Sequence, residues 1–211
     1  MKEQLEVRVY GIDGSLETFS HEDPEWARHT LADLYPTRLF SQEQFTLGDE
    51  SSKKMFASSR ITRVDLITKN LSVWDFPFLL GALEELGESE YEQEIRIARG
   101  EHTIPADITA LHLDLYMLDG RHSFLGVQIV EGLPSVRLNR IYSLLKERRV
   151  IFGLRTAGVG ILNPANVVRF SVCPEPSGQA PIGFVGQGDR NTVLCHFDSE
   201  SQSTSVQINN L

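Results

Sequence analysis

Two stretches of the chain match each other at a constant separation of 106 residues. Residues 5–14 read LEVRVYGIDG and residues 111–120 read LHLDLYMLDG, so that leucine, tyrosine, aspartate and glycine recur at equivalent positions. Residues 55–67 match residues 161–173 at the same offset, with Arg63 aligned to Arg169 and the apolar positions in agreement. Because two separate windows share one offset, the sequence predicts an internal duplication, and this constrains the fold more than any other feature.

The first copy begins with alternating apolar residues at 5–9, which is the period-2 pattern of a half-buried strand. An Asp-Gly turn at residues 13–14 returns the chain into a second strand. Asp23 then precedes Pro24 and an acidic first turn, a pattern typical of a helix start, and we expect Pro36 to end that helix. Hairpin arms are expected at residues 45–47 and 54–56, and a last strand at 61–68.

The second copy repeats this order of elements. The expected elements are strands at 111–116 and 124–130, a helix at 134–149, a hairpin with arms 150–154 and 159–162, and a strand at 167–173. Between the copies, the pattern suggests a helix at 80–86 and a strand at 91–97.

The predicted fold is therefore α+β and β-rich, with a strand-strand-helix-three-strand module present twice. This order of elements resembles that of small Sm-type or SH3-type barrels, which host many functions. The expected divisions are module copy 1 at residues 1–70, a connector at 71–107, module copy 2 at 108–174, and a linker with a possible further strand and a polar tail at 175–211. Modules of this size bury little core alone, so the copies are expected to pack on each other, as separate barrels or as one sheet.

Composition restricts the classes of function. The 211 residues carry a net charge of −9, which opposes general binding to nucleic acids or anionic membranes. No apolar run approaches the ~20 residues of a membrane span, and no secretory signal is evident, so a soluble cytoplasmic protein is expected. Cys173 and Cys195 form neither a disulfide framework nor a metal-ligand spacing. We therefore expect no metal and no cofactor.

The clearest charge feature is a basic segment in copy 2. Residues 137–155 hold six basic residues against one acidic residue, a local net charge of +5 that leaves −14 elsewhere. The candidate binding residues are Arg137, Arg140, Arg148 and Arg149. The helix dipole also stabilises cations near a helix C-terminus. The pattern therefore fits either a solvated helix end or a docking surface. The matching helix of copy 1 is acidic, which allows head-to-tail association of chains.

An aromatic cluster lies in the connector. Trp74, Phe76 and Phe78 alternate outside both copies. They either pack between the copies or form an exposed anchor for a partner, since aromatic residues dominate interface hot spots.

Candidate catalytic motifs are weak. Histidine precedes aspartate by two residues three times, at His21, His112 and His196, and in a strand such residues share a face. Asp23 is better explained as a helix cap, and the other two aspartates as polar faces of strands. The glycine-rich stretches at 158–160 and 183–188 lack the helix that phosphate loops require, so turns and bulges are favoured.

Three functions remain open. The favoured one is a non-enzymatic interaction or scaffold protein with a protein partner or self-association. The second is a nucleic-acid or anionic-ligand binder that uses the basic helix of copy 2. The third is a hydrolase or metal enzyme whose site residues are dispersed in the sequence.

Overall fold

A computed structural model of the chain describes residues 5–48, 52–69, 83–100, 108–130 and 143–173. All of these residues belong to one compact unit, residues 1–178. In the first part of this unit the elements are β1 (Leu5–Gly11), β2 (Leu16–His21), α1 (Pro24–Asp33), α2 (Pro36–Leu39), β3 (Gln44–Gly48), β4 (Lys53–Ala57), the 3-10 turn η1 (Ser58–Arg60) and β5 (Ile61–Ile67).

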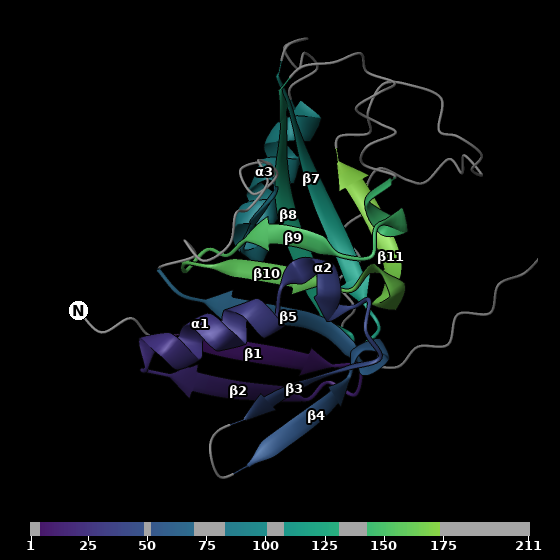
Figure 1. The fold of residues 1–211 in the computed structure, drawn as a ribbon. Helices are drawn as coiled ribbons and strands as arrows, with labels where there is room; N and C mark the ends of the chain where they lie inside the picture. The colour runs from purple at the N-terminus through teal and green to yellow at the C-terminus, as the bar shows by residue number, and fades with distance from the viewer. Residues whose placement is uncertain (1–4, 49–51, 70–82, 101–107, 131–142, 174–211) are drawn as a thin grey trace, which may run out of the picture. The chain divides into compact units, whose positions relative to one another are not determined.

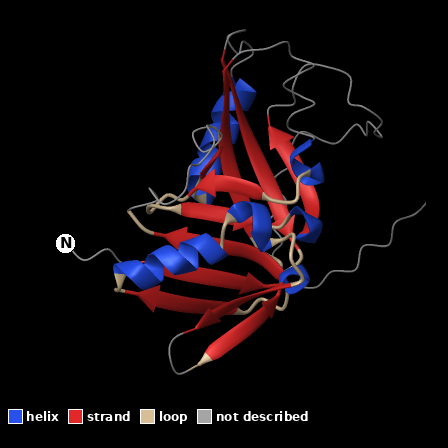
Figure 2. Cartoon of the chain, viewed as in Figure 1, coloured by secondary structure: helices blue, strands red, loops and turns tan. Residues whose placement is uncertain are grey.

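The later elements begin with β6 (Leu83–Glu85) and α3 (Glu88–Gly100). They continue with β7 (Ile108–Met117), β8 (His122–Val130), the 3-10 turn η3 (Leu144–Lys146), β9 (Val150–Gly153), β10 (Val159–Leu162), the 3-10 turn η4 (Pro164–Asn166) and β11 (Val167–Cys173). Figure 1 shows this order along the chain, and Figure 2 shows how far strands predominate.

The strands form one large mixed sheet and one small one. The large sheet has the order β11-β7-β8-β6-β9-β10-β5-β1-β2, and β3 pairs with β4 in a sheet of its own. Neighbours in the large sheet are antiparallel except β6 and β9, which are parallel. The expectation of Sm-type or SH3-type barrels is not met, because the described strands form an open sheet whose edges are β11 and β2.

Local chemistry explains the elements that the sequence predicted correctly. Along β1, buried residues alternate with partly exposed ones, as the period-2 pattern requires. Gly14 has a φ of 80°, so the Asp-Gly turn uses the conformation that glycine adopts without steric cost. The side chain of Asp23 accepts hydrogen bonds from the backbone N–H groups of Glu25 and Trp26, which caps α1.

The predicted end of the first helix before Pro36 is confirmed, because α1 ends at Asp33, and Pro36 then begins the short helix α2. Two other local predictions were wrong. The expected strand at 91–97 lies inside α3, where Tyr91 and Ile95 are buried at the i, i+4 spacing of a helix face. In the described part of the expected helix at 80–86, Leu83–Glu85 is a strand, since these residues pair with β8 and β9.

The helix expected at 134–149 lies mostly outside the described residues. In its described last part, Ser143 is α-helical and residues 144–146 form η3, and Glu147 already has an extended backbone with a ψ of 155°. A helix to Arg149 is therefore wrong, because the chain must be extended to enter β9 at Val150.

The two parts of the sheet agree in detail at the offset of 106. β11 begins and ends 106 residues after β5, and η4 does so after η1. Gly120 repeats the positive φ of Gly14, with 83° against 80°. The N–H of Ile12 donates to the carbonyl of Arg60 at 2.9 Å, and Leu118 donates to Asn166 at the same distance. Strands β5-β1-β2 and β11-β7-β8 also share their antiparallel order.

One strand pair joins the two parts directly. β10 runs antiparallel to β5, with Val159 opposite Leu66 and Leu162 opposite Arg63. The approach is closest at the turn that precedes β10, where Gly158 has a φ of 112°. A Cβ atom added there would lie 2.0 Å from the carbonyl oxygen of Leu66, so only glycine fits.

This strand pair places two hydrophobic cores on opposite faces of β10. Val159 and Ile161 are buried in the first core, with the apolar residues of β1, β5 and α1. Leu162 is buried in the second core, with Phe152 and the apolar residues of β7 and β8. Because side chains alternate along a strand, a single hairpin contributes to both cores.

Replacing Gly158 tests this close approach. We expect Gly158→Ala to lower the free energy of unfolding by about 2–5 kcal/mol, because it combines a strained φ with a backbone clash. Gly120→Ala is the matched control, since Gly120 has a positive φ but open space around it, and it should cost about 1–2 kcal/mol. Urea unfolding of both variants would measure the difference, and equal losses would contradict the interpretation.

Candidate functional site

Two of the predicted binding residues lie in the described part of the chain. Arg148 is exposed and Arg149 is half-buried, just before β9 and outside any helix. The Nε atom of Arg149 is buried and has no hydrogen-bond partner among the described residues. Arg137, Arg140, Trp74, Phe76 and Phe78 lie outside the described residues. The docking surface expected from the basic residues and the anchor expected from the aromatic residues therefore both stay predictions.

A buried ionic network lies beside the junction between β5 and β10. Arg63 on β5 binds Asp65 through two contacts, Nε to Oδ1 at 2.5 Å and Nη2 to Oδ2 at 2.9 Å. The same Nη2 atom donates to Glu85 of β6 at 2.6 Å. Only 15% of the Arg63 side chain and 3% of the Asp65 side chain is exposed. The network therefore links strands from different parts of the chain inside a largely water-excluded space.

Aromatic groups complete this network. The hydroxyl of Tyr10 donates to Oδ2 of Asp65 at 2.9 Å. The guanidinium of Arg63 lies 4.9 Å from the ring centre of Phe152 and 5.4 Å from that of Tyr10, within the range of cation–π attraction. The second core thus meets the network through the ring of Phe152.

The pKa values in the network reflect burial and pairing. Burial raises the pKa of the Asp65 carboxyl, and the neighbouring Arg63 opposes this shift. Burial also acts to lower the pKa of Arg63, but the two carboxylates outweigh it and raise that pKa. Because both oxygens of Asp65 accept from Arg63, we treat the pair as ionised at neutral pH. Burial and the nearby Asp65 charge raise the pKa of Tyr10 to about 12.

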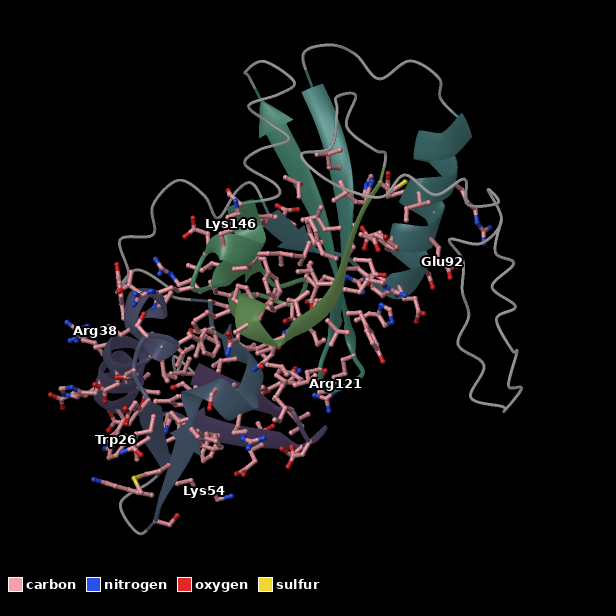
Figure 3. All side chains as sticks on the ribbon, turned by 90° about the vertical axis from the view of Figure 1, so that its right-hand side faces the viewer. Trp26, Arg38, Lys54, Glu92, Arg121 and Lys146 are labelled. Atoms are coloured by element: carbon pink, nitrogen blue, oxygen red, sulfur yellow. The ribbon has the colours of Figure 1, made fainter. Side chains whose placement is uncertain are left out.

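A second set of polar contacts connects the turns of the two parts. The hydroxyl of Thr62 on β5 lies 3.1 Å from the carbonyl oxygen of Tyr10 and 3.0 Å from the carboxylate of Asp119, and its single proton is shared between these two acceptors. Nη2 of Arg121, which is labelled in Figure 3, donates to the carbonyl of Gly14 at 2.8 Å, so the two Asp-Gly turns are in contact.

Two asparagines at η4 form further hydrogen bonds between the two parts of the sheet. Asn163 and Asn166 both donate through their side-chain amides to the carbonyl of Ile61, at 3.1 and 2.8 Å. The backbone N–H of Asn163 also donates to the carbonyl of Thr62 at 2.9 Å. The start of β5 is therefore held by side chains as well as by the strand ladder.

The aspartates of the three histidine–aspartate motifs have different roles: one caps a helix and one forms a hydrogen bond with another histidine. Asp23 caps α1, as the sequence indicated. Asp114 pairs with His122 of the neighbouring strand, Oδ1 to Nδ1 at 2.6 Å, and not with His112. The third pair, at His196, lies outside the described residues. A carboxylate that orients an imidazole meets one geometric requirement of acid–base catalysis. However, the His122 ring also lies between two aromatic rings, stacked on Phe124 and tilted against Tyr116.

That stacking forms a row on one face of β7 and β8. Ring centres follow one another from Tyr91 of α3 to Phe124 at 4.5 Å, to His122 at 5.5 Å, and to Tyr116 at 4.9 Å. The guanidinium of Arg169 lies 5.5 Å from the ring centre of Tyr116. The row fixes α3 on the sheet, which is a structural role.

The described residues contain no group of three or more histidine, cysteine, aspartate or glutamate side chains placed to hold a metal ion. Among the same residues, no helix has the length and apolar character needed to cross a membrane. Comparison with known proteins gives no match to a family model, a curated protein or a solved structure.

Removing one member of the buried ion pair should destabilise the chain strongly. Arg63→Met leaves Asp65 buried without its counter-ion, and we expect a loss of about 3–5 kcal/mol in the free energy of unfolding. Arg8→Met is the matched control, because Arg8 pairs with Glu6 at 41% side-chain exposure and should contribute less than about 1 kcal/mol. Urea unfolding compares the two, and the double variant Arg63→Met/Asp65→Asn should recover much of the loss.

The raised pKa of Tyr10 predicts a loss of stability at high pH. An unfolded tyrosine releases its proton near pH 10, whereas folded Tyr10 retains it up to about pH 12. Stability from this group is complete below pH 10 and falls as the pH rises through 10 to 12. Tyr10→Phe should lose less stability over that interval, as measured by urea unfolding. Parallel curves for the two proteins would contradict the assignment.

Proposed function

We propose that the chain is a non-enzymatic protein-interaction or scaffold protein of the cytoplasm, built from two related β-rich modules that arose by internal duplication. The modules comprise residues 5–67 and 108–173. Their common origin is supported by the shared offset of 106 in strand bounds, turn glycines and turn hydrogen bonds.

The observation that carries this proposal is the pairing of β10 with β5. One module recognises the other by adding a strand to its sheet, which is also a common way for proteins to bind extended segments of a partner. The polar contacts of Asn163, Asn166 and Asp119 add specificity to the backbone ladder. Modules that join in this way suit a protein whose task is to hold chains together.

A second candidate function is binding of nucleic acid or another anionic ligand. It is favoured by the exposed Arg148 and by the Nε atom of Arg149, which has no hydrogen-bond partner within the described part of the chain. Both arginines belong to the segment of net charge +5. The remaining charge of −14 opposes it, because a polyanion would be repelled by most of the surface.

Capture from a lysate of the source cells separates these functions. The tagged full chain is compared with Arg148→Glu/Arg149→Glu and with Val168→Asp, which places a charge on the edge strand β11. The proposal predicts that proteins other than the chain itself remain bound after nuclease treatment, that the arginine variant keeps them, and that Val168→Asp reduces them. Recovery that depends on nucleic acid and on the two arginines would instead establish the second function.

A further inference from the structure

The hairpins β3–β4 and β9–β10 occupy the same place in the two modules but have different surroundings. Both turn one face toward the core of their own module, through Phe45 and Phe56 in the first and Val150 and Leu162 in the second. β10 then pairs with β5 of the other module. β4, its counterpart, pairs only with β3 among the described strands, and β11, the counterpart of β5, pairs only with β7. Each chain therefore has one filled junction, the pairing of β10 with β5. It also has two free strands, β4 and β11, which correspond to the two strands of that junction.

On both free strands, side chains are more exposed than their counterparts in the filled junction. Ile161 of β10 is fully buried, whereas its counterpart Met55 on β4 is 69% exposed. Val64 of β5 is fully buried, whereas its counterpart Phe170 on β11 is only partly buried against the second core.

The same contrast appears at the start of the strand. Thr62 is fully buried beneath Asp119, whereas its counterpart Val168 is 58% exposed. Within the described residues, positions that are buried in the filled junction thus correspond to apolar side chains that are partly or largely exposed on both free strands.

We propose that β4 of one copy pairs with β11 of a second copy, in the register that β10 has on β5. This inference rests on the two-module architecture proposed above. In the internal pairing, each β10 residue is replaced by the β4 residue 106 positions earlier, and each β5 residue by the β11 residue 106 positions later. The resulting register places Met55 opposite Phe170, Lys54 opposite Ser171 and Phe56 opposite Arg169. The occupant of each free strand is therefore another copy of the same chain.

The chemistry at this contact fits the register. Met55 would cover Phe170, and a thioether beside an aromatic ring is a favourable apolar contact. The Asp-Gly turn of the first module would approach β11 as the turn of the second module approaches β5, which places Asp13 near Val168. Lys53 takes the place of buried Val159, but it lies near the strand end, where a long side chain reaches water. The ammonium groups make this contact weaker than the internal one and so reversible (Figure 3 shows Lys54 on β4).

The contact is heterologous, because β4 and β11 are different surfaces. Each copy offers one of each, so a dimer still carries a free β4 and a free β11. Association by this contact continues beyond a dimer, to a closed ring or an open filament.

Two exposed substitutions block the two free strands separately. Met55→Lys puts a charge where the contact needs an apolar side chain, and Val168→Asp puts a carboxylate near Asp13 of the neighbouring copy. Both positions are exposed, so the fold should tolerate the changes. Val168→Thr restores the residue type of the filled junction, and Arg96→Glu on α3 is an exposed charge change that belongs to neither strand.

Sedimentation velocity of the full chain tests the proposal. The wild type, Val168→Thr and Arg96→Glu should show masses that rise with concentration beyond twice the monomer mass of 23.7 kDa. Met55→Lys and Val168→Asp should each remain monomeric alone. An equimolar mixture of these two variants should form a dimer and nothing larger, because one supplies an intact β11 and the other an intact β4.

Three results would overturn the inference: a wild type that stays monomeric up to millimolar concentration, variants that still assemble alone, or a mixture that stays monomeric. A monomeric wild type that still captures other proteins, in a manner sensitive to Val168→Asp, would leave the proposed function standing and remove only self-association.

Discussion

The pairing of β10 with β5 is the interaction on which the rest of the described structure depends. Without it, β5 would lose a neighbour, and the first core would lose Val159 and Ile161, both fully buried. The second core would also lose its anchor, since β9 and β10 carry Phe152 and Leu162 into it. Because β10 is buried on both faces, it couples the two cores, and each part of the sheet gains stability from the other.

The ionic network explains how this pairing keeps its register. A slip of one residue along β5 would turn Arg63 and Asp65 into the first core and turn Val64 and Leu66 out of it. Burying that pair in an apolar core without Tyr10 and Glu85 would cost more than burying it where it lies. The pair is therefore better understood as a determinant of register than as a source of net stability.

The sequence predicted what depends on neighbours along the chain and missed what depends on contacts across it. Alternation and Asp-Gly turns located the strands of both parts, and Asp23 located the start of α1. Leu83–Glu85 forms a strand only because β8 and β9 lie on either side, and nothing local indicates this. The ionic network was missed, although Arg63 and Asp65 stand among apolar residues in the segment 61–67, and charged residues in such a strand require partners.

The proposed contact between copies would use the same chemistry that joins β10 to β5 within one chain. An edge strand with a row of unpaired backbone groups invites pairing, and lysine is a common protection against indiscriminate pairing. β4 carries Lys53 and Lys54 beside exposed Met55, so an arbitrary apolar strand would meet charge as well as an apolar side chain. A strand that already matches the register of this module tolerates that pattern better than an unrelated one. In the proposed contact between copies, protection by charge and recognition by register would act together and would favour the chain's own β11 over other partners.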